Sequence, residues 1–106
     1  MNIHEDKFIS IKKGLLELAV LKIISSNKVY AADILEKLGK TEFATKDGTL
    51  YPLLSRLKRE GALHYEWAES DAGPPRKYYS LTETGKKQLE ALIKYWKDLD
   101  STINNF

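Results

Sequence analysis

Two short segments of alternating polarity, joined by a turn-forming stretch, limit most strongly what this chain can fold into. Leu63–Trp67 alternates apolar and polar residues, which predicts a β-strand. Arg76–Leu81 predicts a second strand, with Tyr79 and Leu81 on one face. Ser70–Pro75 lies between them and is dense in turn formers. We therefore expect a β-hairpin whose loop is Ser70–Pro75.

Three helical segments precede this hairpin. Lys12–Ser25 carries apolar residues on more than one side, which predicts a helix that is covered broadly, in part by a second subunit. Ala31–Leu38 has apolar residues at the i, i+3, i+4 and i+7 positions, and Asp47–Glu60 repeats this spacing with leucines. Gly39 and Gly61 follow these two segments and are typical helix stops.

The last segment carries a heptad repeat. Thr82 is a typical N-cap for the helix that follows it. Apolar residues fill the a and d positions over three heptads, and such a seam usually packs against another helix. The seam consists of Leu89, Leu92, Trp96, Leu99, Ile103 and Phe106. Because it would otherwise be exposed, we expect a homodimer.

The order helix, helix, helix, hairpin, long helix predicts a mostly α fold with one β-hairpin. These are the parts of a winged helix-turn-helix domain, in which the third helix can enter a DNA major groove. We expect residues 1–81 to form the winged-helix DNA-binding domain. Residues 82–106 would form a C-terminal dimerisation helix within the same compact unit.

The side of the third helix that its leucines leave free is polar and basic. Arginine can donate hydrogen bonds to guanine or phosphate, and hydroxyl groups suit phosphate oxygens. Two cations follow the rigid Gly73–Pro75 segment at the hairpin tip, where they suit the minor groove or the adjacent backbone. The candidate DNA-contacting residues are Lys46, Thr49, Tyr51, Pro52, Ser55, Arg56, Arg59, Arg76 and Lys77. The same face could instead bind a protein, so a winged-helix protein-interaction module is the alternative.

The composition argues against an enzyme and against a bound cofactor. The chain has no cysteine, and its two histidines, His4 and His64, are far apart in sequence. Disulfide frameworks, thiol nucleophiles and cysteine-based metal sites are therefore excluded, and a histidine-rich metal site is not expected. No phosphate-binding loop or paired carboxylates are recognisable. The net charge is only +2, so a nucleic-acid role requires a local basic patch.

The sequence predicts no membrane partner. The richest apolar stretch, Leu15–Ile24, is interrupted by Glu17 and Lys22 and falls short of the roughly 20 residues that span a bilayer. The first eight residues include acids, which is unlike the basic start of a secretory signal. We expect a cytoplasmic protein.

The two tryptophans allow two interpretations. Trp67 on a strand and Trp96 in the heptad seam are most simply core aromatics. However, an indole at an a position cannot pack as closely as a branched aliphatic side chain. Trp96 could therefore leave a slot between the subunits that suits a planar aromatic ligand.

Three segments carry a resemblance to a known family. Asp47–Leu57, which reads DGTLYPLLSRL, closely resembles the recognition-helix signature of the PadR family of bacterial transcriptional regulators. Gly73–Tyr79, which reads GPPRKYY, is similar to the wing of that family, and Leu81–Gly85 to the start of its last helix. Gly14–Glu17 and Leu21 resemble its first helix. The resemblance covers nearly the whole chain.

The resemblance implies a homodimeric, winged-helix repressor, for which two-fold symmetry predicts a palindromic operator. It implies that the first and last helices, including Leu15, form the subunit interface. It places the following residues on the DNA side: Thr49, Tyr51, Pro52, Arg56, Arg76 and Lys77. Trp67 and Trp96 match tryptophans of multidrug-sensing members, which implies that a planar aromatic ligand relieves repression. The second helix departs from the pattern, since Tyr30–Ala32 reads Tyr-Ala-Ala where the family often has Tyr-Gly-Tyr.

Overall fold

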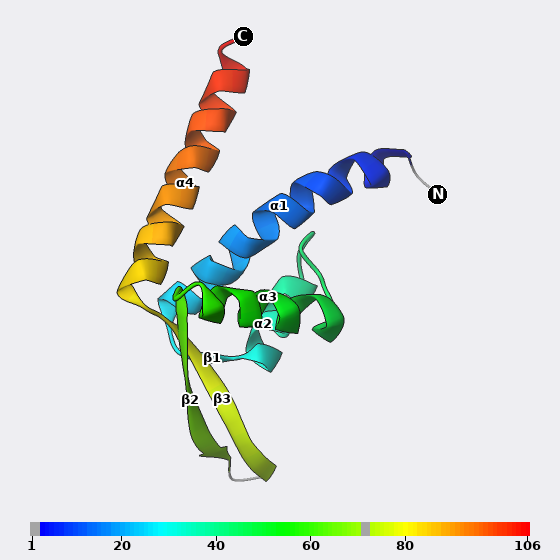
Figure 1. Ribbon diagram of the computed structural model, residues 1–106. Helices are drawn as coiled ribbons and strands as arrows, with labels where there is room; N and C mark the ends of the chain where they lie inside the picture. The colour runs from blue at the N-terminus through cyan, green and yellow to red at the C-terminus, as the bar shows by residue number, and fades with distance from the viewer. Residues whose placement is uncertain (1–2, 71–72) are drawn as a thin grey trace.

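A computed structural model describes residues 3–70 and 73–106, with side chains from residue 7 onward (Figure 1). The elements in chain order are α1 (Ile3–Ser26), β1 (Val29–Tyr30), α2 (Ala31–Gly39), α3 (Asp47–Arg59), β2 (Leu63–Ser70), β3 (Gly73–Leu81) and α4 (Glu83–Asn104). The strands form an antiparallel sheet in the order β1-β3-β2. The predicted mostly α fold with a hairpin is confirmed, and the hairpin and α4 leave the helical body in roughly opposite directions (Figure 1).

The helix boundaries match the sequence prediction at α2 and α3 and differ at α1. Each of the two shorter helices begins at the predicted residue and ends one residue away from the predicted end. In contrast, α1 begins at Ile3 rather than Lys12. The segment before Lys12 contains neither proline nor glycine, so nothing in it stops the helix. The side chain of His4 lies outside those that the structure describes.

The predicted loop Ser70–Pro75 is wrong. Strand β2 continues to Ser70 and β3 begins at Gly73, so both prolines lie within a strand. The short β1 pairs only with Tyr78 and Tyr79 of β3. At Pro74 and Pro75, β3 has β2 as its only described neighbour, and a residue without an N–H is tolerated there. Asp71 and Ala72 of the predicted loop lie outside the described residues.

The hydrophobic core lies where α1, α2, α3 and the base of the sheet meet. Leucines of α3 at the predicted spacing are almost fully buried, and Tyr79 of β3 is 6% exposed. Leu89 of α4 is 7% exposed and belongs to this same core. Leu89 is therefore not part of an exposed apolar seam, which begins only beyond it. The core consists of Val20, Leu21, Ile24, Val29, Ala31, Ile34, Leu38, Leu50, Leu54, Leu57, Ala62, Leu63, Tyr79 and Leu89.

The start of α4 is fixed against the end of α3. Thr82 caps α4 by accepting a 3.0 Å hydrogen bond from the Gly85 N–H, as the sequence predicts. The Thr82 N–H donates to the Ala62 carbonyl at 3.1 Å. Gly61 has a positive φ of 81°, and a Cβ atom at Gly85 would collide with the Ala62 carbonyl oxygen. Two glycines thus allow the chain to turn and α4 to begin close to β2.

The outer part of α4 exposes the remainder of the heptad seam. Trp96 and Leu99 are more than 40% exposed, and Ile103 and Phe106 are exposed further still. Leu92 is only partly buried. Within residues 3–70 and 73–106, no helix is both long enough and apolar enough to cross a membrane.

Candidate nucleic-acid interface

A groove of about 440 Å³ lies between the start of α2, the exposed side of α3 and the β2–β3 hairpin, which we call the wing. It brings together side chains that the sequence separates by almost fifty residues. Its lining consists of Tyr30, Ala31, Ala32, Tyr51, Ser55, Trp67, Pro75, Arg76, Lys77 and Tyr79. We call it the wing groove. Phenol hydroxyls, a serine hydroxyl and two cations therefore line one surface.

The cations of the wing groove lie over aromatic rings. Lys77 Nζ is 4.4 Å from the ring centre of Tyr65 and 5.3 Å from that of Trp67. Arg76 Cζ is 5.3 Å from the ring centre of Tyr30. These distances are within the range of cation–π attraction. Among the described residues neither cation forms an ion pair with a carboxylate, so both charges are available to a phosphate.

Tyr30 connects the wing with the second helix. Its ring stacks on Tyr78 of β3 with the centres 4.0 Å apart. The hydrogen bond to Tyr78 is the main cause that raises the pKa of Tyr30. The Tyr30 N–H donates to Asp33 Oδ2 at 3.0 Å at the start of α2. Tyr30 thus provides one of the contacts between the wing and the helical body, at the β1–α2 junction.

Arg56 of α3 is held by two carboxylates. Its Nη2 donates to Glu17 Oε1 at 2.5 Å, and its Nη1 donates to the two Glu60 oxygens at 3.2 and 3.0 Å. These hydrogen bonds raise the pKa of the Arg56 guanidinium. Both terminal nitrogens therefore already have protein partners. This geometry disfavours the predicted reading of a base edge by Arg56.

A second hollow, of about 540 Å³, lies between α1 and α4. Its lining is mostly apolar but includes two lysines. The lining residues are Leu15, Leu18, Ala19, Lys22, Phe43, Ile93, Trp96 and Lys97. We call it the α1–α4 hollow. Leu15 and Trp96, which the sequence assigned to a subunit interface, both lie in it.

The comparison with known proteins identifies the family. Residues 20–91 match the model of the transcriptional regulator PadR-like family. The chain belongs to this family. A PadR-like transcription factor from Bacteroides fragilis is 43% identical, with a TM-score of 0.80 over 94% of this chain and 97% of that one. A PadR-like transcriptional regulator from Bacillus cereus is 38% identical, with a TM-score of 0.81 over 91% and 94% of the two chains.

A curated relative is likewise described as a transcriptional regulator. Transcriptional regulator Rv3488 of Mycobacterium tuberculosis is 31% identical over 78 residues, which are 74% of this chain and 72% of that protein. The predicted family and the winged-helix fold are therefore confirmed. This PadR-like chain is a transcription regulator rather than an enzyme, and its family implies DNA as its partner.

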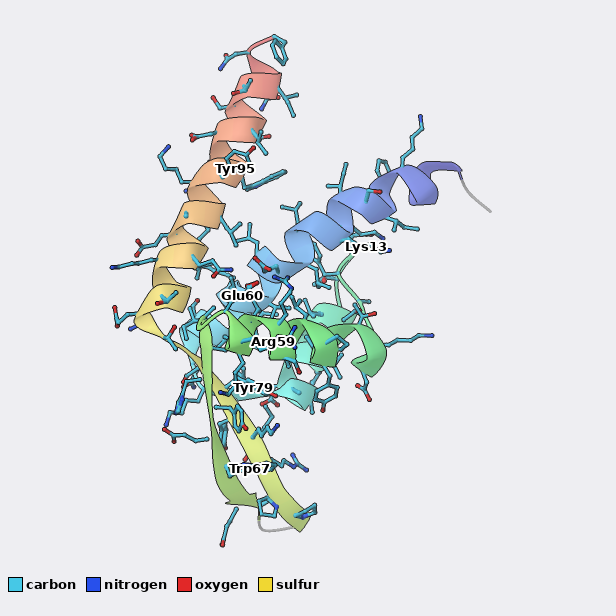
Figure 2. The ribbon with its side chains drawn as sticks, in the orientation of Figure 1. Lys13, Arg59, Glu60, Trp67, Tyr79 and Tyr95 are labelled. Atoms are coloured by element: carbon cyan, nitrogen blue, oxygen red, sulfur yellow. The ribbon has the colours of Figure 1, made fainter. Side chains whose placement is uncertain are left out.

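The structure divides the predicted DNA-contacting residues of the PadR-like chain into groups. The wing groove brings together Tyr51, Ser55, Arg76 and Lys77. Thr49 instead lines a small hollow with Lys12 and Lys13 of α1. Arg56 turns to Glu17, as described above. The remaining predicted residues, which are exposed on α3 or immediately before it, are Lys46, Pro52 and Arg59. Arg59 is labelled on α3 in Figure 2.

The two tryptophans of this PadR-like chain line separate hollows. Trp67 is 63% exposed in the wing groove, so its interpretation as a core aromatic is wrong. Trp96 lies in the α1–α4 hollow. Figure 2 shows Trp67 on the wing and Tyr95, next to Trp96 in sequence, far away on α4. Within one chain, Trp67 and Trp96 do not form a common ligand site.

Sequence reasoning missed two residues of this interface, Tyr30 and Trp67, which line the wing groove. Lys58, on the polar side of α3 that the sequence predicts, has its Nζ 5.0 Å from the Tyr65 ring centre. A signal for Trp67 was present, because Tyr65 and Trp67 are two residues apart and share one face of a strand, and Lys77 pairs with Trp67 on the neighbouring strand. No local spacing indicates Tyr30, which reaches the groove through the two-residue strand β1.

Proposed function

We propose that this chain is a homodimeric repressor that binds a palindromic operator through the wing groove and the exposed side of α3. The single observation that carries this proposal is the position of Arg76 and Lys77, held over aromatic rings beside the hydroxyls of Tyr51 and Ser55. Cations with neutral partners keep their full charge for DNA phosphates. We propose that the protein binds its operator in the bacterial cytoplasm.

The contacts divide by chemistry. Hydroxyl groups and lysines suit phosphate oxygens, which position a protein on the duplex without reading its sequence. We assign Lys46, Ser55 and Lys77 to the backbone. We assign Arg59, on the exposed side of α3, to the major groove. We assign Arg76, on the wing, to the minor groove.

The proposed dimer uses the exposed ends of α1 and α4. Phe8 and Ile11 of α1 are more than half exposed, and so are Ile103 and Phe106 of α4. Apolar surface of this extent, in helices that diverge from one body, suits a second copy of the chain (Figure 1). Two-fold symmetry would then place the recognition helices about 34–36 Å apart on DNA.

The proposed inducer is a planar aromatic molecule in the α1–α4 hollow. Trp96 is 43% exposed and offers a ring face for stacking. Lys22 and Lys97 also line the hollow, which favours a neutral or anionic ligand over a cationic one. A ligand there lowers DNA affinity only if it prefers the arrangement of α4 that does not bind DNA.

The test is selection of bound fragments from a random DNA pool, with and without candidate planar compounds. We expect enrichment of a palindrome, and weaker retention when an effective compound is present. Sedimentation at tens of micromolar protein should give a dimer. Enrichment of no sequence, or a monomer that binds a single half-site as tightly as the palindrome, would contradict the proposal.

A further inference from the structure

One carboxylate of α1 contacts both α3 and α4. Glu17 Oε1 accepts the 2.5 Å hydrogen bond from Arg56 of α3. Glu17 Oε2 accepts a 3.2 Å hydrogen bond from Nε2 of Gln88, in the second turn of α4. The Glu17 side chain is only 20% exposed. Glu17 therefore joins the recognition helix to the helix that we assign to the dimer.

The contact with Glu17 restrains α3 in a way that its leucines do not. Leu50, Leu54 and Leu57 hold α3 to the core by burial, which has no preferred direction. The guanidinium of Arg56 is instead fixed between Glu17 and Glu60 by charge-assisted hydrogen bonds, which require a defined geometry. Rotation of α3 about its axis would break the bond to Glu17 first, because Glu60 is the C-cap of α3 and moves with it.

We propose that Glu17 is a positioning residue for DNA recognition: it sets the orientation of α3 through Arg56 and transmits movements of α4 through Gln88. This inference rests on the proposed use of α3 and the wing groove for DNA. Displacement of α4 would pull on the same carboxylate that orients α3. Arg56 then contributes to operator choice through the helix it orients rather than by touching a base.

Electrostatics and positioning predict opposite effects when the charge of Glu17 is removed. Glu17 is a negative charge that partly neutralises Arg56 of α3, and Glu17→Gln would leave Arg56 Nη2 without its anionic partner while Glu60 still holds Nη1. Both changes strengthen binding to any DNA through the phosphates. Loss of α3 orientation, in contrast, weakens binding to the selected operator alone. The ratio of the two affinities therefore isolates the positioning role.

The experiment compares Kd for the selected operator with Kd for unrelated DNA of equal length, at one salt concentration. In the full-length Glu17→Gln variant we expect the operator preference to fall about tenfold, with no loss of affinity for unrelated DNA. The matched control is Glu83→Gln, which makes the same change at an exposed carboxylate of α4 whose only ion-pair partner among the described residues is Lys86. An unchanged preference in Glu17→Gln, even with a lower melting temperature, overturns the proposal.

Two further variants keep the inference falsifiable. Arg56→Lys retains the charge but loses the planar fork, so it should reproduce the lost preference if Glu17→Gln does not fold. For the link to α4, Gln88→Leu should lower the preference alone but add nothing to Glu17→Gln, because both remove one connection. Additive effects would overturn the transmission through Gln88.

Variants of the wing distinguish a failure of this inference from a failure of the proposed function. If Arg76→Ala with Lys77→Ala leaves DNA binding unchanged, the proposed use of the wing groove fails. If that double variant loses DNA binding while Glu17→Gln keeps its operator preference, only the positioning role of Glu17 fails.

Discussion

The guanidinium carbon of Arg76 lies 5.3 Å from the centre of the Tyr30 ring, and this contact ties the wing to the residue that precedes α2. Tyr30 also stacks on Tyr78, which lies in β3 together with Arg76. The position of Arg76 relative to α3 therefore depends on an aromatic residue that belongs to neither the wing nor the recognition helix.

We predict that Tyr30→Leu weakens DNA binding although it removes no charge. The Arg76 side chain would lose a cation–π contact worth about 0.5–1 kcal/mol at an exposed site, which corresponds to roughly two- to fivefold in Kd. Fluorescence anisotropy with labelled operator measures this change. Tyr95→Leu, at an exposed ring of α4, is the control. Equal affinity for the two variants would show that Tyr30 does not organise the wing.

Gly85→Ala should destabilise the fold by about 1–3 kcal/mol, because its methyl group would collide with the Ala62 carbonyl oxygen. Gly14→Ala is the matched control, since a Cβ atom there meets nothing within 4 Å and α1 should gain about 0.5–1 kcal/mol. Urea denaturation of the two variants gives both free energies of unfolding. If Gly85→Ala proves as stable as the wild type, α4 does not begin as close to Ala62 as described.

The predictable part of this fold is the part with local periodicity. The leucine spacing of Asp47–Glu60 located α3, and Thr82 marked the start of α4. Leu63, Tyr65 and Trp67 share one face of β2, as alternation requires. Leu63 is 3% exposed, however, whereas Trp67 is 63% exposed, because the wing extends beyond the core that the base of the strand covers. Alternation indicates the face but not where the core ends.

The site depends on contacts that no local pattern contains. Arg56 and Glu17 are 39 residues apart in sequence, so helical spacing placed Arg56 on a polar face without revealing its partner. Pro74 and Pro75 of β3 suggested a loop because they belong to a stretch dense in turn formers. The two-residue strand β1 is too short to show any period in the sequence. Only the register of the sheet, in which β1 pairs with Tyr78 and Tyr79 alone, explains why Pro74 and Pro75 are tolerated within β3.

We predict that Tyr79 makes the fold sensitive to alkaline pH. Burial raises the pKa of Tyr79 above its ordinary value, so the folded state holds the phenol proton more tightly than the unfolded state. Its contribution is fully present below about pH 10 and is lost as the pH rises further. Urea denaturation between about pH 8 and pH 11 should therefore show a smaller alkaline decline for Tyr79→Phe. An identical decline in wild type and variant would contradict this origin.

Substitutions of the two tryptophans should have different effects on the binding of flat dyes. Trp96→Leu should abolish the binding of flat dyes, because Trp96 lines the α1–α4 hollow. Trp67→Leu should retain dye binding and lose DNA affinity, since its ring lies 5.3 Å from Lys77 in the wing groove. Tryptophan fluorescence and sedimentation of both variants provide the measurement. Equal dye binding by Trp96→Leu, with the oligomer intact, would remove the ligand site.

The most direct test of the account is the salt dependence of operator binding in the wild type and in the Arg76→Ala, Lys77→Ala double variant. Each phosphate contact contributes about 0.9 to the slope of log affinity against log salt concentration, so losing the two Lys77 contacts of the dimer should reduce the slope by about 1.8. We predict weaker binding and this smaller slope, with the wild-type thermal stability retained. The same affinity and the same slope in both proteins would contradict the assignment of the wing groove to DNA.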